Sequence, residues 1–150
     1  MSLLNNPFAL IATTSLTIQV IVLLLLLYGY LLKRRLKFRQ HGTTMAIAVV
    51  LHLIMVFAIM IPSFVFAVIP EYVVRNPLEL TSIVGLVHGT AGTLAISLGV
   101  WLVTSWRFRK DFKGCFNKKK TMLGTMIIWV ASLLFGIALY TIFYWAILIS

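Results

Sequence analysis

The sequence contains four apolar runs, each long enough to cross a lipid bilayer, at residues 8–32, 43–69, 81–105 and 121–149. A transmembrane helix needs about 20 apolar residues, and lipid offers no water to an unpaired backbone group, so each run is expected to be a helix. The chain is 61% hydrophobic and only 11% charged, whereas about a quarter of the residues in a soluble domain are charged. The sequence therefore predicts an all-α fold, with residues 1–150 forming one integral membrane domain of four antiparallel transmembrane helices in up-down order.

The positive charges are concentrated in two of the connections between these runs. Of the thirteen lysines and arginines, five follow the first run and seven follow the third, while Arg75 stands alone in the second connection. Because cytoplasmic loops carry the excess of Lys and Arg, both basic connections are predicted to be cytoplasmic and both termini outside the cytoplasmic membrane. The net charge of +10 is then explained by topology and by contact with anionic lipid headgroups, with no role for nucleic acid. The residues assigned to this role are Lys33, Arg34, Arg35, Arg107, Arg109, Lys118, Lys119 and Lys120.

Two histidines, His52 and His88, lie inside apolar runs of membrane length. An ionisable side chain within a membrane is by default a functional-site hypothesis; its alternative is a hydrogen bond to a neighbouring helix. In the third run, His88 belongs to a stripe of small residues at three- and four-residue steps, which lets a neighbouring helix approach closely. The small members of that stripe are Gly85, Gly92, Ala95 and Gly99, and the fourth run contributes Gly136.

Matching stripes are expected on the first two helices. The second run places His52 in such a stripe, and the first run places the amide of Gln19 near the middle of its span. We expect these faces to look into the bundle, with the second and third runs forming its central hairpin. Pro62 is predicted to kink or unwind the second helix, which is expected to end at Pro70.

Few residues in the sequence could carry chemistry. It has no Walker-type phosphate loop, no HExxH, no CxxC and no pair of buried carboxylates, so we expect no enzyme. Histidine and methionine suit haem iron or copper. At 1.5 Å per residue, His52 and His88 each lie about 10 Å from opposite edges of a core about 30 Å thick, which leaves an axial gap of about 10 Å. This gap disfavours one haem shared by both. The alternatives are His–Met ligation with Met55 or Met60, or a hydrogen bond from His88 to Gln19 or to a backbone carbonyl.

Several residues together resemble a known family of small four-helix membrane proteins, which is associated with cytochrome oxidase assembly (CtaM-like) and grouped with b-type cytochrome and haem A synthase bundles. The residues that carry the resemblance are the segment 29–35 (GYLLKRR), His41, Met45, His88, Trp129, Gly136 and Tyr140. The resemblance implies a four-helix bundle in which His41, near the cytoplasmic interface, and His88 correspond to family histidines. A further family histidine falls at Lys118 here, and His52 stands where the family has a small hydroxyl residue. These departures remove the obvious partner for His41 and favour a chain that keeps the scaffold as a structural subunit.

Two main functional hypotheses follow from these observations. The first is a non-catalytic accessory or assembly subunit of a larger membrane complex of respiratory or metalloenzyme type. It would pack against lipid and other integral membrane subunits and need no cofactor. The second is a haem b-binding redox or oxidase assembly protein, with His88, His52 and His41 as candidate ligands. A small transporter, for which only Pro62 hints at a broken helix, is the third alternative.

Overall fold

The computed structural model describes residues 7–108 and 118–148, and in these ranges the chain is helical with no strand. The four helices long and apolar enough to cross a membrane confirm the predicted all-α membrane bundle. Their elements are α1 (Pro7–Arg34), α2 (Phe38–Met55) with its continuation through α3 (Ile61–Ser63) to Val73, α4 (Leu80–Phe108) and α6 (Lys119–Leu148).

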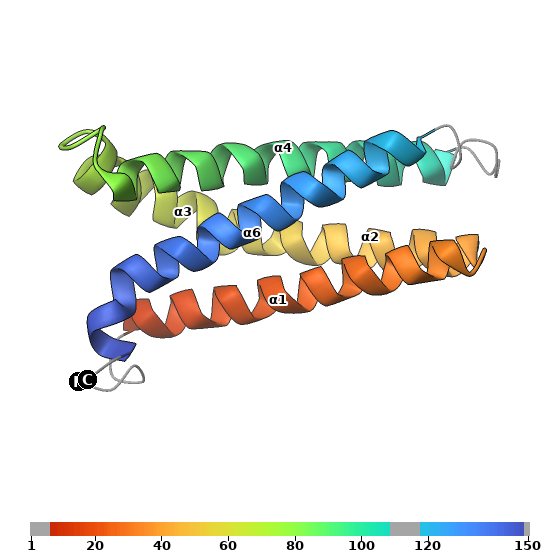
Figure 1. The fold of residues 1–150 in the computed structure, drawn as a ribbon, viewed down its shortest axis with the longest axis horizontal. Coiled ribbons are helices and arrows are strands. Elements are labelled where there is room, and N and C mark those ends of the chain that lie inside the picture. Colours follow the sequence, from red (N-terminus) through yellow and green to blue (C-terminus); the bar gives the residue numbers. More distant parts are fainter. Residues whose placement is uncertain (1–6, 109–117, 149–150) are drawn as a thin grey trace.

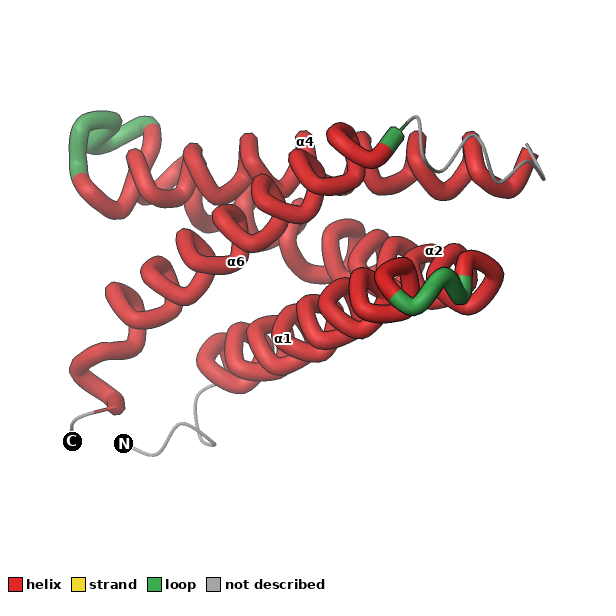
Figure 2. Tube along the Cα trace, turned by 45° about the vertical axis from the view of Figure 1, so that its right-hand side comes forward, coloured by secondary structure: helices red, strands yellow, loops and turns green. Residues whose placement is uncertain are grey.

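The helices pack as two pairs, α1 with α2 and α4 with α6. Figure 1 shows α6 crossing the bundle diagonally, from the C-terminal end of α4 toward the N-terminal end of α1. Figure 2 shows α1 and α2 running side by side, with the first turns of α6 lying apart from both at the end where α2 begins. The predicted central hairpin of the second and third spans is therefore not the main packing unit, because α4 makes its largest contact with α6. A hydrogen bond of 2.8 Å between the hydroxyls of Thr13 and Tyr140 joins α1 to α6 at the opposite end.

The turn between α1 and α2 is only three residues long. The N–H of Lys37 bonds the carbonyl of Leu32 at 3.0 Å, and the N–H of Leu36 bonds the carbonyl of Lys33 at 3.1 Å. This pair of bonds is a Schellman motif, whose left-handed position is occupied here by Leu36 at φ 58°. The second helix consequently begins at Phe38, five residues before the predicted start, and His41 lies inside it.

The second span continues past both of its prolines. Its hydrogen bonding widens to π-helical turns over Val56–Met60 and again over Phe64–Val73. The disturbance predicted at Pro62 takes the form of these wider turns on either side of it, because a proline lacks the N–H that a regular turn would use. The predicted end of the helix at Pro70 is wrong, since the N–H of Val74 still bonds the carbonyl of Ile69 at 2.9 Å.

The core lies where all four helices meet. Its buried residues are Val22, Leu26, Ala48, Val49, Ala95 and Trp129. The stripes predicted from helical periodicity face inward, since Gln19, Ala48, His52, Gly85, Ala95 and Gly99 are all buried. Large apolar side chains such as Leu24, Ile54 and Leu134 are exposed on the outside, as expected for a surface that meets lipid.

Candidate functional site

His88 is bonded to α6 rather than left free in the membrane. Its Nδ1–H donates to the carbonyl of Ser132 at 2.8 Å, and the Ser132 hydroxyl donates to the carbonyl of His88 at 3.2 Å. Two glycines make this approach close. A Cβ added to Gly136 would lie 2.9 Å from the His88 ring, and one added to Gly92 would lie 3.2 Å from the Ser132 hydroxyl. The backbone-carbonyl bond that the sequence suggested as one alternative for His88 is confirmed.

Gln19, the other partner suggested for His88, makes a different contact. Its Nε2 donates to the thioether of Met60 at 3.6 Å, a weak bond to the second span. Gln19 faces into the bundle as predicted. Its role is to join α1 to the wide turn at Val56–Met60.

His52 is the most enclosed of the three histidines, with 4% of its surface exposed. Its ring packs against Trp129, with centroids 4.7 Å apart, and its Nδ1 has no hydrogen-bond partner in the described chain. Trp129 is in turn held against α4, where a Cβ on Gly99 would meet the indole at 3.0 Å. His52 is therefore a packing residue whose polar atom is left without compensation.

His52 and His88 lie at different depths along α6. His52 packs on Trp129, whereas His88 bonds Ser132 and lies against Gly136, three and seven residues further along, which is about 5 to 10 Å at 1.5 Å per residue. Two ligands of one metal ion each lie about 2 Å from it, so this pair is not placed to share an iron. Among the described residues, no three His, Cys, Asp or Glu side chains form a group that could hold a metal ion.

His41 is buried in the contact between α1 and α2, at the basic end of the bundle. Its place near the cytoplasmic interface stays a prediction. Its Nδ1–H donates to the carbonyl of Gly29 at 2.7 Å, which leaves Nε2 with the free lone pair. Neighbouring glycines again allow the approach, because a Cβ on Gly29 would overlap the Met45 side chain and one on Gly42 would overlap the indole of Trp106. The helix start at Phe38 explains this position, since it brings His41 within one turn of the α1–α2 turn.

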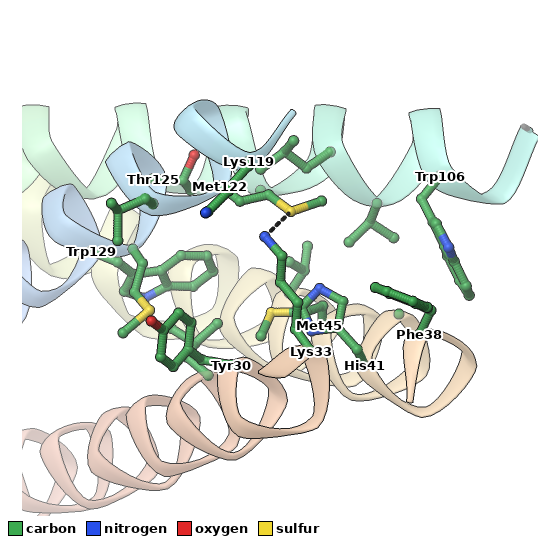
Figure 3. Close-up of a pocket in the computed structure, with 18 of the residues that line it drawn as sticks. Tyr30, Lys33, Phe38, His41, Met45, Trp106, Lys119, Met122, Thr125 and Trp129 are labelled. Carbon is green, nitrogen blue, oxygen red and sulfur yellow. Dashed lines mark hydrogen bonds between the residues drawn. The ribbon is translucent and has the colours of Figure 1, made fainter. Parts of the chain in front are cut away.

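A cavity of about 410 Å³ lies beside His41, at the end of the bundle where the basic residues gather. We call it the basic-end cavity. It is bounded by the C-terminal turns of α1 and α4 and the N-terminal turns of α2 and α6, and Figure 3 shows its side chains. The lining residues labelled in Figure 3 include Tyr30, His41, Met45, Trp106, Met122 and Trp129.

Three cations line the basic-end cavity: Lys33 and Arg34 from α1 and Lys119 from α6. The Lys33 ammonium points into the cavity, where its partner is the sulfur of Met122 at 3.4 Å (Figure 3). The two described carboxylates lie at the other end of the spans, Glu71 in the last turn of the second span and Glu79 in the connection before α4. Sequence reasoning missed this cavity. It assigned Lys33, Arg34 and Lys119 to topology and to contact with lipid headgroups at the membrane surface, although each stands within a turn of an apolar run.

The other residues that the sequence singled out have separate roles or lie outside the residues that the structure describes. Lys118 donates to the Ser105 hydroxyl at 2.6 Å and lies 4.2 Å from the ring centroid of Trp101, so it joins α6 to α4. Gly85 faces the second span, where Val68 would lie 3.3 Å from an added Cβ. Arg35 and Lys120 are exposed. Arg107 is in the last turn of α4, but its side chain is not among those described. Arg109 lies outside the described residues.

No family model, no curated protein and no solved structure matches the chain. The resemblance to the CtaM-like family stays a prediction.

Proposed function

We propose that the chain is a non-catalytic accessory or assembly subunit of a larger membrane complex, and that it binds a partner's transmembrane helix on the outer face of α4. Small hydroxyl residues are exposed along this face at helical spacing. They are Thr90, Thr93, Ser97 and Thr104. Each hydroxyl bonds a carbonyl of its own helix four residues earlier, at 2.7 to 2.8 Å. The hydroxyls of this face are therefore satisfied within α4, and the residues that carry them are small.

The single observation that carries this proposal is the likeness between the outer and the inner face of α4. Small residues at membrane interfaces let two helix backbones approach closely, and the inner face uses Gly92 and Gly99 for that purpose against α6. The outer face carries a similar stripe on which no helix of the described residues packs, while Leu94 and Trp101, the latter in contact with Lys118, project between its hydroxyls. Such a surface suits knobs-into-holes packing with a second helix.

The test is co-purification from the native membrane in mild detergent. Thr93→Leu adds bulk to the proposed contact face and should release the partner subunit. Thr17→Leu is the matched control, because Thr17 is also exposed and bonds its own helix, to Thr13, at 2.8 Å. The proposal expects an integral membrane partner with the wild type and Thr17→Leu, and its loss with Thr93→Leu. A wild-type chain that elutes monodisperse and alone would contradict it.

A second candidate function, haem b binding, is favoured by the surroundings of His41. A metal-bound histidine almost always donates its other ring N–H to a carbonyl or carboxylate, which orients the ring, and His41 has this bond to Gly29. Its Nε2 would hold the iron, the Met45 or Met122 thioether would be the second ligand, and Lys33 and Lys119 would pair with the propionates. A bound haem would supply one-electron transfer at a potential set by those ligands.

This candidate changes which histidine should be tested first. Both His41 and His88 donate Nδ1–H to a backbone carbonyl, but His41 is the histidine that lines the basic-end cavity, so the geometry favours it over the other two. A reduced-minus-oxidised absorption spectrum of the purified protein should lose its haem bands in His41→Ala and keep them in His88→Ala. A colourless wild type, or bands that survive His41→Ala, would reject haem at this site.

A further inference from the structure

We propose that the basic-end cavity binds one anionic phospholipid of the surrounding leaflet, with its phosphate at Lys33 and part of an acyl chain against the apolar wall. This inference goes beyond the accessory function and does not depend on it. It concerns a ligand held within the chain, whereas the partner would bind on the outer face of α4.

The first argument is the position of the Lys33 charge. The ammonium lies in a cavity with mostly apolar walls, and the acceptor that it reaches is the Met122 thioether at 3.4 Å. A thioether is a weak acceptor, and a charge that is partly removed from water is costly unless it is paired and hydrogen-bonded. A phosphate oxygen in the cavity would supply the missing partner.

The second argument is that further cations converge on the same space. Arg34 comes from the last residue of α1 and Lys119 from the first residue of α6, so two helices contribute charge to one opening. Within the described chain the carboxylates are Glu71, in the last turn of the second span, and Glu79, in the connection that follows, both at the far end of the bundle. The cavity therefore has a net positive charge that no described acid offsets. Basic pockets between transmembrane helices on the cytoplasmic side bind anionic headgroups.

The third argument is the polarity gradient inside the cavity. The cations are at its mouth, whereas Leu26, Val49 and Trp129 form the deeper wall nearer the core. The cavity volume is about 410 Å³. Typical small-molecule sites have volumes of roughly 300 to 1,000 Å³, so the cavity is large enough for part of a lipid. A charged head above an apolar body is the shape of a lipid, and the bilayer supplies such molecules directly to a site at the end of a bundle.

The chain offers a matched pair of variants for the test. Lys33→Met keeps the length of the side chain and removes the charge inside the cavity. Lys120→Met removes the same charge from an exposed residue one position beyond Lys119, outside the cavity lining. Val103→Phe, on the cavity wall, adds volume without changing any charge, and it keeps the test valid if Lys33→Met fails to fold.

The experiment is native mass spectrometry of the full chain in nanodiscs of phosphatidylglycerol and phosphatidylcholine in equal amounts. The proposal expects one retained phosphatidylglycerol on the wild type and on Lys120→Met, at least tenfold less on Lys33→Met, and loss on Val103→Phe. Equal retention by Lys33→Met and Lys120→Met, or equal retention of the two lipids, would overturn it. Haem or a fatty acid found at full occupancy in protein from the native membrane, in place of phospholipid, would also overturn it.

Discussion

His88 and Ser132 bond each other twice across the contact between α4 and α6, with each side chain bonding the other residue's carbonyl. The distances are 2.8 Å for the bond from His88 and 3.2 Å for the bond from Ser132. Each side chain has a backbone partner, so a polar pair in the membrane interior costs little. The two bonds also fix the register of the two helices, because either bond would be lost if one helix slid by a residue.

The first prediction concerns Gly136, which lies against the His88 ring. A Cβ at position 136 would lie 2.9 Å from the His88 ring, whereas nothing lies within 4 Å of one at Gly124 on the same helix. Overpacking a tight contact costs about 1–3 kcal/mol, so Gly136→Ala should lower the melting temperature in detergent. Gly124→Ala should leave it unchanged or raise it, since alanine is favoured over glycine in helices by about 1 kcal/mol. Equal melting temperatures for the two variants would refute this packing.

The second prediction separates the two membrane histidines by stability. His52→Phe keeps a ring on Trp129 and removes a buried nitrogen that has no partner; relief of such a penalty is worth about 1–3 kcal/mol. Its thermal stability should therefore equal or exceed that of the wild type. His88→Phe should be less stable, because it removes the hydrogen bond that His88 donates to the Ser132 carbonyl across the two helices. A destabilised His52→Phe would mean that His52 Nδ1 has a partner, such as a buried water or a ligand.

The third prediction concerns the turn between α1 and α2. Leu36 has φ 58°, a left-handed conformation, and is 68% exposed. This conformation costs a non-glycine residue about 1–2 kcal/mol, so Leu36→Gly should raise the free energy of unfolding. Leu31→Gly is the control, because Leu31 is an exposed residue inside α1, where glycine is expected to destabilise by about 1 kcal/mol. Destabilisation by both variants would argue against the left-handed turn.

The fourth prediction tests the orientation in the membrane. Leu78 and Gln40 are exposed at opposite ends of the second span, and the only native cysteine is Cys115. In a Cys115→Ser background, an impermeant maleimide added to intact cells should label Leu78→Cys but not Gln40→Cys. Permeabilised cells should show both labels, which confirms that Gln40→Cys is reactive. The reverse pattern would place the basic end outside and contradict the positive-inside assignment.

Helical periodicity in the sequence was enough to predict the buried stripes and the separation of His52 from His88. Both depend only on the spacing of residues along a helix, which is why Gln19, Ala48 and Ala95 are buried as expected. The position of His41 was not predictable in the same way. It depends on a turn closed by Leu36, and leucine gives no signal for the left-handed position that glycine usually occupies.

The basic-end cavity also escaped sequence reasoning, because it depends on how whole helices cross. The diagonal course of α6 brings Lys119 and Met122 over Lys33 (Figure 3), and no spacing within one helix encodes that angle. Positive charges beside a membrane span are explained sufficiently by topology. Contact with lipid headgroups was also predicted from the sequence, but the cavity that these charges line is found only when the space between the helices is known.

The most direct test of the proposed function is native mass spectrometry of the wild-type chain, released from its own membrane in polymer nanodiscs, with an absorption spectrum of the same sample. We expect a complex of this chain with a different integral membrane protein, with one anionic phospholipid retained after the bulk lipid is removed. A chain that appears alone or only as copies of itself, with no retained anionic lipid, would contradict it. A stoichiometric haem b that is lost in His41→Ala would instead assign the chain to the second candidate function.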